Sequence, residues 1–240
     1  MSSPTGATAS SPASAPWPAA SSGTPIPAAE RAYAHVKEQV LTDSLPGGTM
    51  VSEGDIAAQL SMSRTPVREA FLRLESEGWL RLYPKRGALV VPVAAGEAQS
   101  VVDARLLLEV HAVEALRHRD DRERLHERLS ASIEQQRAAL DRGDIDAYAE
   151  HDTEFHLTIV AAGGNPLLTS FYVTLRERQR RMVARSLWRD ESRARSFVTQ
   201  HEHLAAAVGA GAVAEFKVAL RRHLDHAHLP ERAAAAVDAR

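Results

Sequence analysis

The chain has 240 residues, of which 44% are apolar and 25% are charged, as in an ordinary globular protein with one large domain or two small ones. Its formal net charge of −2 gives the whole molecule no attraction to nucleic acid, so any DNA-binding surface must be local. The absence of cysteine excludes disulfide bonds and thiolate metal sites, and it is consistent with a reducing, cytoplasmic location.

Both ends of the chain have the composition of tails. Residues 1–27 are rich in Ser, Ala and Pro, and the first charged residue is Glu30. This composition predicts disorder, and without a basic or an apolar region the segment does not resemble a secretory signal. Residues 231–240 are expected to form a shorter C-terminal tail. No apolar run approaches the ~20 residues that span a bilayer, so no membrane partner is expected.

Three helices are expected in the first third of the chain. They span residues 28–43, 53–60 and 63–77. Ser52 and Ser63 are the predicted N-caps of the second and third helices, since a serine side chain can accept a hydrogen bond from a free N–H of the first turn. Pro66 falls in the first turn of the third helix, where its missing N–H has no intrahelical partner, and Gly78 is suited to the position after its end.

Two β-prone runs follow these helices, at residues 79–83 and 88–91. They are joined by the short basic segment Pro84-Lys85-Arg86-Gly87, which predicts a β-hairpin with its loop at the glycine. Three helices followed by a hairpin are typical of a winged helix-turn-helix. We assign this DNA-binding domain to residues 28–92.

Residues 93–230 have helical periodicity and no strand signal, and glycine-containing segments interrupt them. The predicted helices span residues 96–118, 120–141, 144–162, 166–190, 194–208 and 212–228. A bundle of about six helices is the simplest way to pack them. The predicted fold is therefore mainly α, with an N-terminal winged helix-turn-helix and a C-terminal all-α bundle.

The run from Ser63 to Ala70 is the strongest functional signal. Arg64 and Arg68 are one helical turn apart and share a face, while an apolar stripe marks the opposite face. Ser63 and Thr65 can donate to phosphates near the positive end of the helix dipole, and the two arginines can reach guanine edges in the major groove. The alternative is a solvated charged helix.

The predicted wing supplies a second contact surface for DNA. Lys85 and Arg86 carry the charge for an adjacent groove, and Gly87 allows close approach of the backbone. Between Ser63 and Arg86 the chain has six basic and three acidic residues, although the whole chain is negative. The agreement of cap, turn, core stripe and basic hairpin favours DNA binding over a solvated surface.

These motifs resemble the winged helix-turn-helix of GntR-family bacterial transcription regulators. The resemblance rests on Ser63–Ala70, Leu74–Gly78 and Pro84–Gly87. It implies that Ser63, Arg64, Thr65, Arg68 and Gly87 contact the operator. One departure is Gly54, which stands where some relatives carry a basic residue that contacts DNA.

A metal site is suggested by residues further along the chain. Asp152 and His156 are four residues apart on a predicted helix, so a carboxylate and an imidazole share one face. His203 and His223 lie on two later helices that a bundle can bring to the same place. One carboxylate and three neutral imidazoles suit Zn²⁺ first, with Ni²⁺, Mn²⁺ and Fe²⁺ as alternatives.

On spacing alone, a surface pair and two core histidines explain the same pattern, because the chain has 11 histidines. Periodicity does not settle which faces point inward. His151, His201, His226 and His228 are equally polar decoys.

Residues 96–228 resemble the helical effector-binding domain of FadR-like regulators, the FCD domain. The resemblance rests on Arg105 and Glu109, Asp152–His156, Gly164-Asn165, Glu202-His203-Leu204 and His223-Leu224. In the metal-binding members the Asp and three His ligate the ion, which implies Asp152, His156, His203 and His223 here. One departure is that Leu204 directly follows His203, where relatives often have two intervening residues.

The same resemblance implies a small carboxylate as the effector. Arg105 would pair with its carboxylate, a task for which a forked guanidinium is suited. The alternative role for Arg105 is an intrahelical ion pair with Glu109. The later arginine cluster is expected to be mostly solvated, with Arg178 or Arg181 able to reach the pocket. Its members are Arg176, Arg178, Arg180, Arg181 and Arg185.

These features together favour a sequence-specific DNA-binding transcription regulator rather than an enzyme. It would act as a homodimer on a palindromic operator, and the effector bound at the metal site would control its affinity for DNA. One alternative is a metal sensor without an organic effector. Another is a metalloenzyme, although Glu154 points away from the face shared by Asp152 and His156 and leaves no evident general base there.

Overall fold

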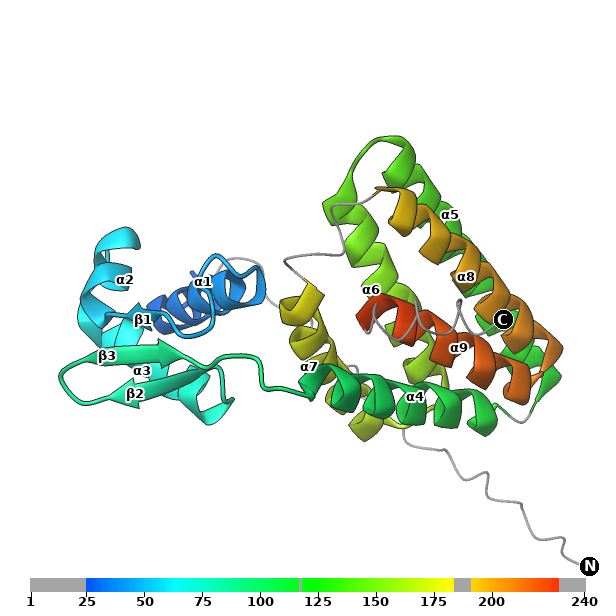
Figure 1. The fold of residues 1–240 in the computed structure, drawn as a ribbon, viewed down its shortest axis with the longest axis horizontal. Helices are drawn as coiled ribbons and strands as arrows, with labels where there is room; N and C mark the ends of the chain where they lie inside the picture. The colour runs from blue at the N-terminus through cyan, green and yellow to red at the C-terminus, as the bar shows by residue number, and fades with distance from the viewer. Residues whose placement is uncertain (1–24, 117, 184–190, 229–240) are drawn as a thin grey trace, which may run out of the picture.

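A computed structural model describes residues 25–116, 118–183 and 191–228. They form an N-terminal domain with a small sheet and a C-terminal helical bundle, and α7 of the bundle faces α1 (Figure 1). The predicted tails lie outside the described residues apart from a few positions, as does the predicted end of the helix at 184–190. No helix in the described part of the chain is long and apolar enough to cross a membrane.

The N-terminal domain has the predicted winged helix-turn-helix architecture. Its elements are α1 (Ala28–Leu41), β1 (Met50–Val51), α2 (Glu53–Gln59), α3 (Arg64–Ser76), β2 (Leu80–Tyr83) and β3 (Gly87–Val90). The strands form an antiparallel sheet in the order β1-β3-β2. The sequence did not predict β1, because two residues are too few to show the alternation that identifies a strand. Val51 of β1 pairs with Ala88 of the hairpin.

Local sequence signals explain where these helices begin and end. The Ser52 hydroxyl accepts a hydrogen bond from the Asp55 backbone N–H at 3.0 Å and caps α2. Ser63 occupies the N-cap position of α3, but its side chain makes no capping hydrogen bond and is exposed. Gly78 follows α3 with φ +81°, a left-handed conformation that favours glycine. Val67 and Phe71 on the inner face of α3 are fully buried.

The C-terminal domain confirms the prediction of an all-α bundle. Its helices are α4 (Glu97–Ala115), α5 (Arg119–Asp141), α6 (Ile145–Ala162), α7 (Pro166–Val183), α8 (Glu191–Ala210) and α9 (Val213–His228). Helix α5 packs against α6 and α8, and α4 packs against α6, α7 and α9 (Figure 1). Helices α4, α5, α6, α8 and α9 share a hydrophobic core, and α7 packs against α4 and α6. This packing brings together side chains from distant parts of the sequence.

A close approach between α4 and α6 helps to position these side chains. A Cβ atom added to Gly163, at the end of α6, would lie 2.8 Å from the Cα atom of Ala112 in α4. A larger residue would force the two helices apart. Their proximity lets Glu109 of α4 reach His156 of α6.

Candidate functional site

The N-terminal turns of α3 present the predicted DNA-contacting residues on one surface. Ser63, Arg64, Thr65 and Arg68 are all exposed, while Val67 between them is fully buried. The apolar side thus holds the helix on its domain and the polar side is free to meet a ligand. This is the arrangement of a recognition helix that enters a DNA groove with its N-terminus.

Gly54 leaves space beside one of these arginines. A Cβ atom at Gly54 would lie 3.3 Å from Arg64 Nη2, so the guanidinium of α3 lies over the start of α2. Gly54 carries no cation of its own, but the guanidinium of Arg64 lies beside that position. Arg73, further along α3, pairs with Glu30 at 2.8 Å and with Glu77 at 3.3 Å and is part of the domain's internal structure.

The wing has a strained turn with two exposed cations. Lys85 and Arg86 are exposed, and Lys85 has φ +64°. Gly87 has φ +97°, and a Cβ atom there would lie 2.5 Å from the carbonyl oxygen of Val51. Glycine is therefore required by the packing of β3 against β1, an internal reason separate from any approach to DNA.

Four buried side chains meet at the centre of the helical bundle. They are Asp152 and His156 of α6, His201 of α8 and His223 of α9. One potential ligand atom from each lies within 4.8 Å of the others. A carboxylate and three imidazoles from three helices, buried away from solvent, form a donor set that fits a divalent metal ion.

The structure corrects one predicted ligand of this cluster. His203 is exposed, and His201 occupies the place expected for it. Two residues turn a helix by about 200°, so the two side chains lie on nearly opposite faces. The buried stripe of α8 includes Phe197, His201, Leu204 and Val208, at spacings of four, three and four residues. That stripe is the sequence signal that identifies His201 as the inward residue.

Each of the three clustered histidines has its Nδ1 atom held by an oxygen. His156 Nδ1 lies 2.8 Å from Glu109 Oε2, and His201 Nδ1 lies 2.7 Å from Gln136 Oε1. The third, His223 Nδ1, lies 3.0 Å from Gln200 Oε1 of α8. These oxygens only accept hydrogen bonds, so each Nδ1 must donate. In a neutral imidazole Nε2 then carries a lone pair and not a proton.

The Nε2 atoms of these histidines point toward one another. His156 Nε2 and His223 Nε2 are 3.1 Å apart, and the buried His201 Nε2 has no hydrogen-bond partner in the described part of the chain. Burial lowers the pKa of His156 well below its ordinary value and that of His201 to about 4, so both stay neutral near pH 7. Converging lone pairs repel one another, and a cation placed among them relieves this repulsion. The residues present therefore fit a metal.

Asp152 completes the donor set with an ionised carboxylate. Burial alone would raise its pKa, but the Arg176 guanidinium and the clustered histidines hold that pKa below the usual value. Asp152 Oδ2 accepts a hydrogen bond from Arg176 Nη2 at 2.9 Å, and Oδ1 lies 3.5 Å from His201 Nε2. One oxygen is thus held by arginine while the other faces the histidines.

Arg105 is fully buried beside this cluster. Its Nε atom donates to Glu109 Oε1 at 3.0 Å, so the pair within α4 is formed. It also contacts the Tyr172 hydroxyl at 3.1 Å and donates from Nη1 to Gln179 Oε1 at 2.8 Å. Arg105 Nη2 has no hydrogen-bond partner among the described residues. An unpaired buried guanidinium nitrogen costs free energy, and an anionic ligand would satisfy it.

The inner face of α7 supplies three buried residues to the site, of which only Arg176 was considered from the sequence. Tyr172, Arg176 and Gln179 are buried, at spacings of four and three residues that put them on one side of the helix. Arg176, expected at the surface, is the arginine of this helix that reaches the site. Arg178 instead contacts Glu97 at 3.1 Å, and Arg181 donates to the Val91 carbonyl near the N-terminal domain.

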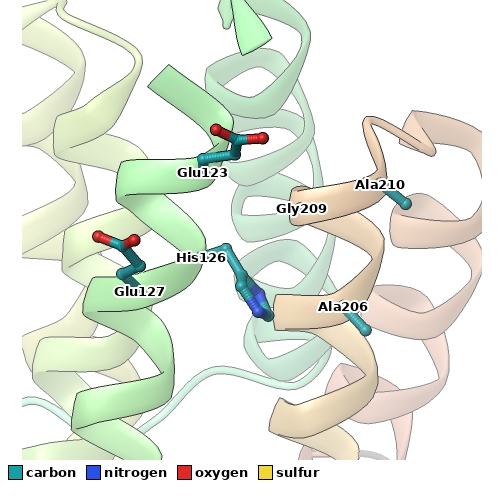
Figure 2. A pocket seen from close by; sticks show the side chains of 6 residues that line it. All are labelled: Glu123, His126, Glu127, Ala206, Gly209 and Ala210. Carbon is teal, nitrogen blue, oxygen red and sulfur yellow. The ribbon is translucent and has the colours of Figure 1, made fainter. Parts of the chain in front are cut away.

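Another pocket lies on the surface between α5 and α8, but its polar side chains do not point toward one another as those of the buried cluster do. Glu123 and Glu127 point away from His126, whose ring faces α8 (Figure 2). His126 Nδ1 lies 2.9 Å from the carbonyl oxygen of Ala205, and Glu123 pairs with Arg119 at 2.7 Å. The side chains of this pocket serve packing and surface ion pairs, so the buried cluster is the candidate ligand site.

Two family models together match most of the chain. The model described as "Bacterial regulatory proteins, gntR family" matches residues 28–90, and the model of the FCD domain matches residues 100–226. The first range holds α3 and the wing. The second holds all four residues of the metal-like cluster.

Sequence relatives are transcription regulators. The gluconate operon transcriptional repressor of Bacillus subtilis is 35% identical over 127 residues, which are 53% of this chain and 51% of the repressor. An uncharacterized HTH-type regulator of Streptomyces ambofaciens is 29% identical over 192 residues, which are 80% of each chain. The chain therefore spans about half of the gluconate repressor that it matches.

Solved structures share the whole architecture at low sequence identity. A GntR regulator from Rhodococcus sp. RHA1 has a TM-score of 0.67 at 19% identity, covering 84% of this chain and 96% of the other. E. coli McbR/YncC has a TM-score of 0.65 at 22% identity, covering 84% and 95%. Given the two matched domains, their order and their fold, the chain belongs to the GntR family of DNA-binding transcription regulators, in its FadR-like subfamily with an FCD domain.

Proposed function

We propose that this regulator changes its affinity for operator DNA when its buried site binds a divalent metal ion and a small carboxylate. The DNA contacts are made by Ser63, Arg64, Thr65 and Arg68 of α3 and by the wing tip. The wing residues are Lys85, Arg86 and Gly87. As a DNA-binding protein of a bacterial family it works in the cytoplasm, where the chromosome is.

The metal would be held by Asp152, His156, His201 and His223. Zn²⁺ is the first choice because it favours nitrogen and carboxylate ligands in this number, with Ni²⁺, Mn²⁺ and Fe²⁺ as alternatives. When bound, the ion supplies a fixed positive charge that attracts an oxygen ligand. Arg105, with its unpaired Nη2, would pair with the effector carboxylate.

The observation that carries the proposal is that α7 belongs to both the buried site and the contact between domains. Its inner face places Arg176 and Gln179 in the site. Its outer face places Glu177 2.8 Å from Lys37 of α1, and Arg180 2.8 Å from a carboxylate oxygen of Glu38. A ligand that moves the inner face of α7 would act on the DNA-binding domain through these ion pairs.

Lys37 is the partly buried centre of the contact between the domains. Lys37 lies between Glu77 of its own domain at 3.0 Å and Glu177 of α7 at 2.8 Å. Burial would lower the pKa of Lys37, but hydrogen bonds to Glu177, Tyr33 and Glu77 raise it above its ordinary value. The ammonium is therefore charged at neutral pH. A ligand that favours one position of α7 favours one pose of the DNA-binding domain, a coupling typically worth ~1–3 kcal/mol.

We further propose a homodimer that binds a palindromic operator. Exposed apolar side chains gather on α4 and α7, two helices that pack against each other: Leu107 is 71% exposed, Leu167 70% and Phe171 67%. Large exposed apolar side chains on adjoining helices are typical of a protein–protein interface. A two-fold axis would place two α3 helices on the two half-sites of the operator.

Operator affinity is the direct test. A duplex selected from a random library by the metal-loaded full-length protein would be labelled for fluorescence anisotropy. We expect chelation of the metal, or addition of a binding acid from a carboxylate panel, to change Kd by ~5- to 150-fold. Arg64→Ala and Arg68→Ala should each abolish specific binding, while Arg124→Ala on the exposed face of α5 should not. An affinity that is insensitive to chelation and to every acid would overturn the proposed control.

A second candidate function is a metal sensor without an organic effector. It is favoured by the completeness of the donor set, because Asp152 and three histidines can satisfy a tetrahedral ion without a further ligand. In the anisotropy experiment the sensor would respond to metal alone and to none of the acids.

A further inference from the structure

Two buried guanidinium groups share one neutral acceptor beside the metal-like cluster. Gln179 Oε1 accepts a hydrogen bond from Arg105 Nη1 at 2.8 Å and another from Arg176 Nη1 at 2.8 Å. All three residues are buried: Arg105 is 0% exposed, Arg176 is 8% exposed and Gln179 is 4% exposed. Two like charges are thus held close together, out of water, by an amide oxygen of α7.

An amide oxygen is a weak partner for this position. A carboxylate makes shorter and roughly twice as strong hydrogen bonds to guanidinium groups as a neutral acceptor does. Each arginine has one carboxylate elsewhere, Glu109 for Arg105 and Asp152 for Arg176. In the described contacts no carboxylate accepts hydrogen bonds from both arginines, and Arg105 Nη2 has no hydrogen-bond partner among the described residues.

The charge of the site also favours a ligand with more than one negative group. The two arginines balance Asp152 and Glu109, with which they form buried ion pairs. A divalent cation bound to the cluster would leave about two uncompensated positive charges in a buried region. Uncompensated buried charge is costly, so a ligand with two negative charges binds this site better than one with a single charge.

We infer that the effector is a dianion of the dicarboxylate class, one of whose carboxylates takes the place of Gln179 Oε1 between Arg105 and Arg176. Arg176 is then a specificity-determining residue that distinguishes two-charge from one-charge acids. The inference rests on the proposed function, because it names the class of effector that the same site would take. Displacing Gln179 also acts on α7, the helix that contacts the DNA-binding domain.

Matched pairs of acids and their monoamides test the charge preference. Malonate, succinate and glutarate, each with its monoamide, would be titrated calorimetrically into the metal-loaded full-length protein. At least one dicarboxylate should bind about tenfold more tightly than its monoamide, a difference of about 1.4 kcal/mol. Equal affinity for dicarboxylate and monoamide would overturn the inference while leaving a carboxylate effector in place. If none of these acids binds, the inference is contradicted. The anisotropy experiment with a wider panel of acids would then show whether the proposed control by an effector also fails.

Gln179→Glu supplies the missing carboxylate from the protein itself. The substitution is nearly isosteric, so the unliganded variant should have a raised Tm while its dicarboxylate affinity falls by at least about tenfold. Its metal affinity, measured by chelator competition, should not fall, because Gln179 touches none of the four ligands in the described contacts and the added negative charge offsets positive charge at the site. Unchanged dicarboxylate affinity in this variant would contradict the inference.

Arg176 variants separate specificity from support of the fold. Arg176→Gln should bring the ratio of dicarboxylate to monoamide affinity toward one, and Arg176→Lys should restore part of it. A purely structural role would weaken both ligands together and leave the ratio unchanged, which would also contradict the inference.

Discussion

His201 and His203 provide a matched pair of substitutions on one helix. His201 is fully buried in the cluster, whereas His203 is exposed on the other side of α8. Structural zinc sites with four ligands bind with roughly 10–16 kcal/mol, so one ligand of four contributes roughly 2.5–4 kcal/mol. We therefore expect His201→Ala to weaken metal binding by roughly a hundredfold to a thousandfold and His203→Ala to leave it nearly unchanged.

Competition with a chromophoric zinc chelator measures both affinities under the same conditions. Circular dichroism should show that both variants keep the helical fold, since loss of the fold would itself remove the site. Equal losses in the two variants, or a larger loss in His203→Ala, would refute the assignment of His201 as a ligand and the helix phase from which it follows.

Three further substitutions test the surroundings of the site and the domains. Glu109→Gln should weaken metal binding by roughly tenfold, because the Glu109 carboxylate orients His156 without being a ligand itself. Chelator competition measures the effect, and Glu114→Gln on the same helix is the control. In denaturant titrations, Gly87→Ala should lower the unfolding free energy of the DNA-binding domain by roughly 1–3 kcal/mol. Gly48→Ala should lower it less, because Gly48 has a similar φ but a Cβ added there would meet no described atom within 4 Å. Phe171→Glu should shift the protein toward monomers in sedimentation velocity at micromolar concentration; a dimer that survives would place the interface elsewhere.

Local signals in the sequence were sufficient to predict the DNA-binding domain. The cap at Ser52, the turn glycine Gly78 and the apolar stripe of α3 act within a few residues, and the structure has each of them. Strand β1 was missed because its identity depends on pairing with β3, almost forty residues away. The requirement for glycine at position 87 has the same long-range origin, since it comes from the Val51 carbonyl.

The buried site was harder to predict because its geometry depends on packing between helices. Asp152 and His156 share one helix, so their spacing alone placed them together. His201 required the inward face of α8 to be identified, and the family pattern pointed to His203 instead. The roles of Gln136 and Arg176 follow only from contacts between helices distant in sequence, for which periodicity gives no signal.

The coupling between the buried site and the DNA-binding domain is tested most directly by the affinity of the acid itself. The dicarboxylate that binds best would be titrated calorimetrically into metal-loaded full-length protein, free and saturated with the selected operator duplex. Because coupling is reciprocal, the acid's Kd should differ between the two titrations by ~5- to 150-fold, by the same factor that the acid changes operator affinity. Equal acid affinity in the two titrations would contradict control of DNA binding by this site.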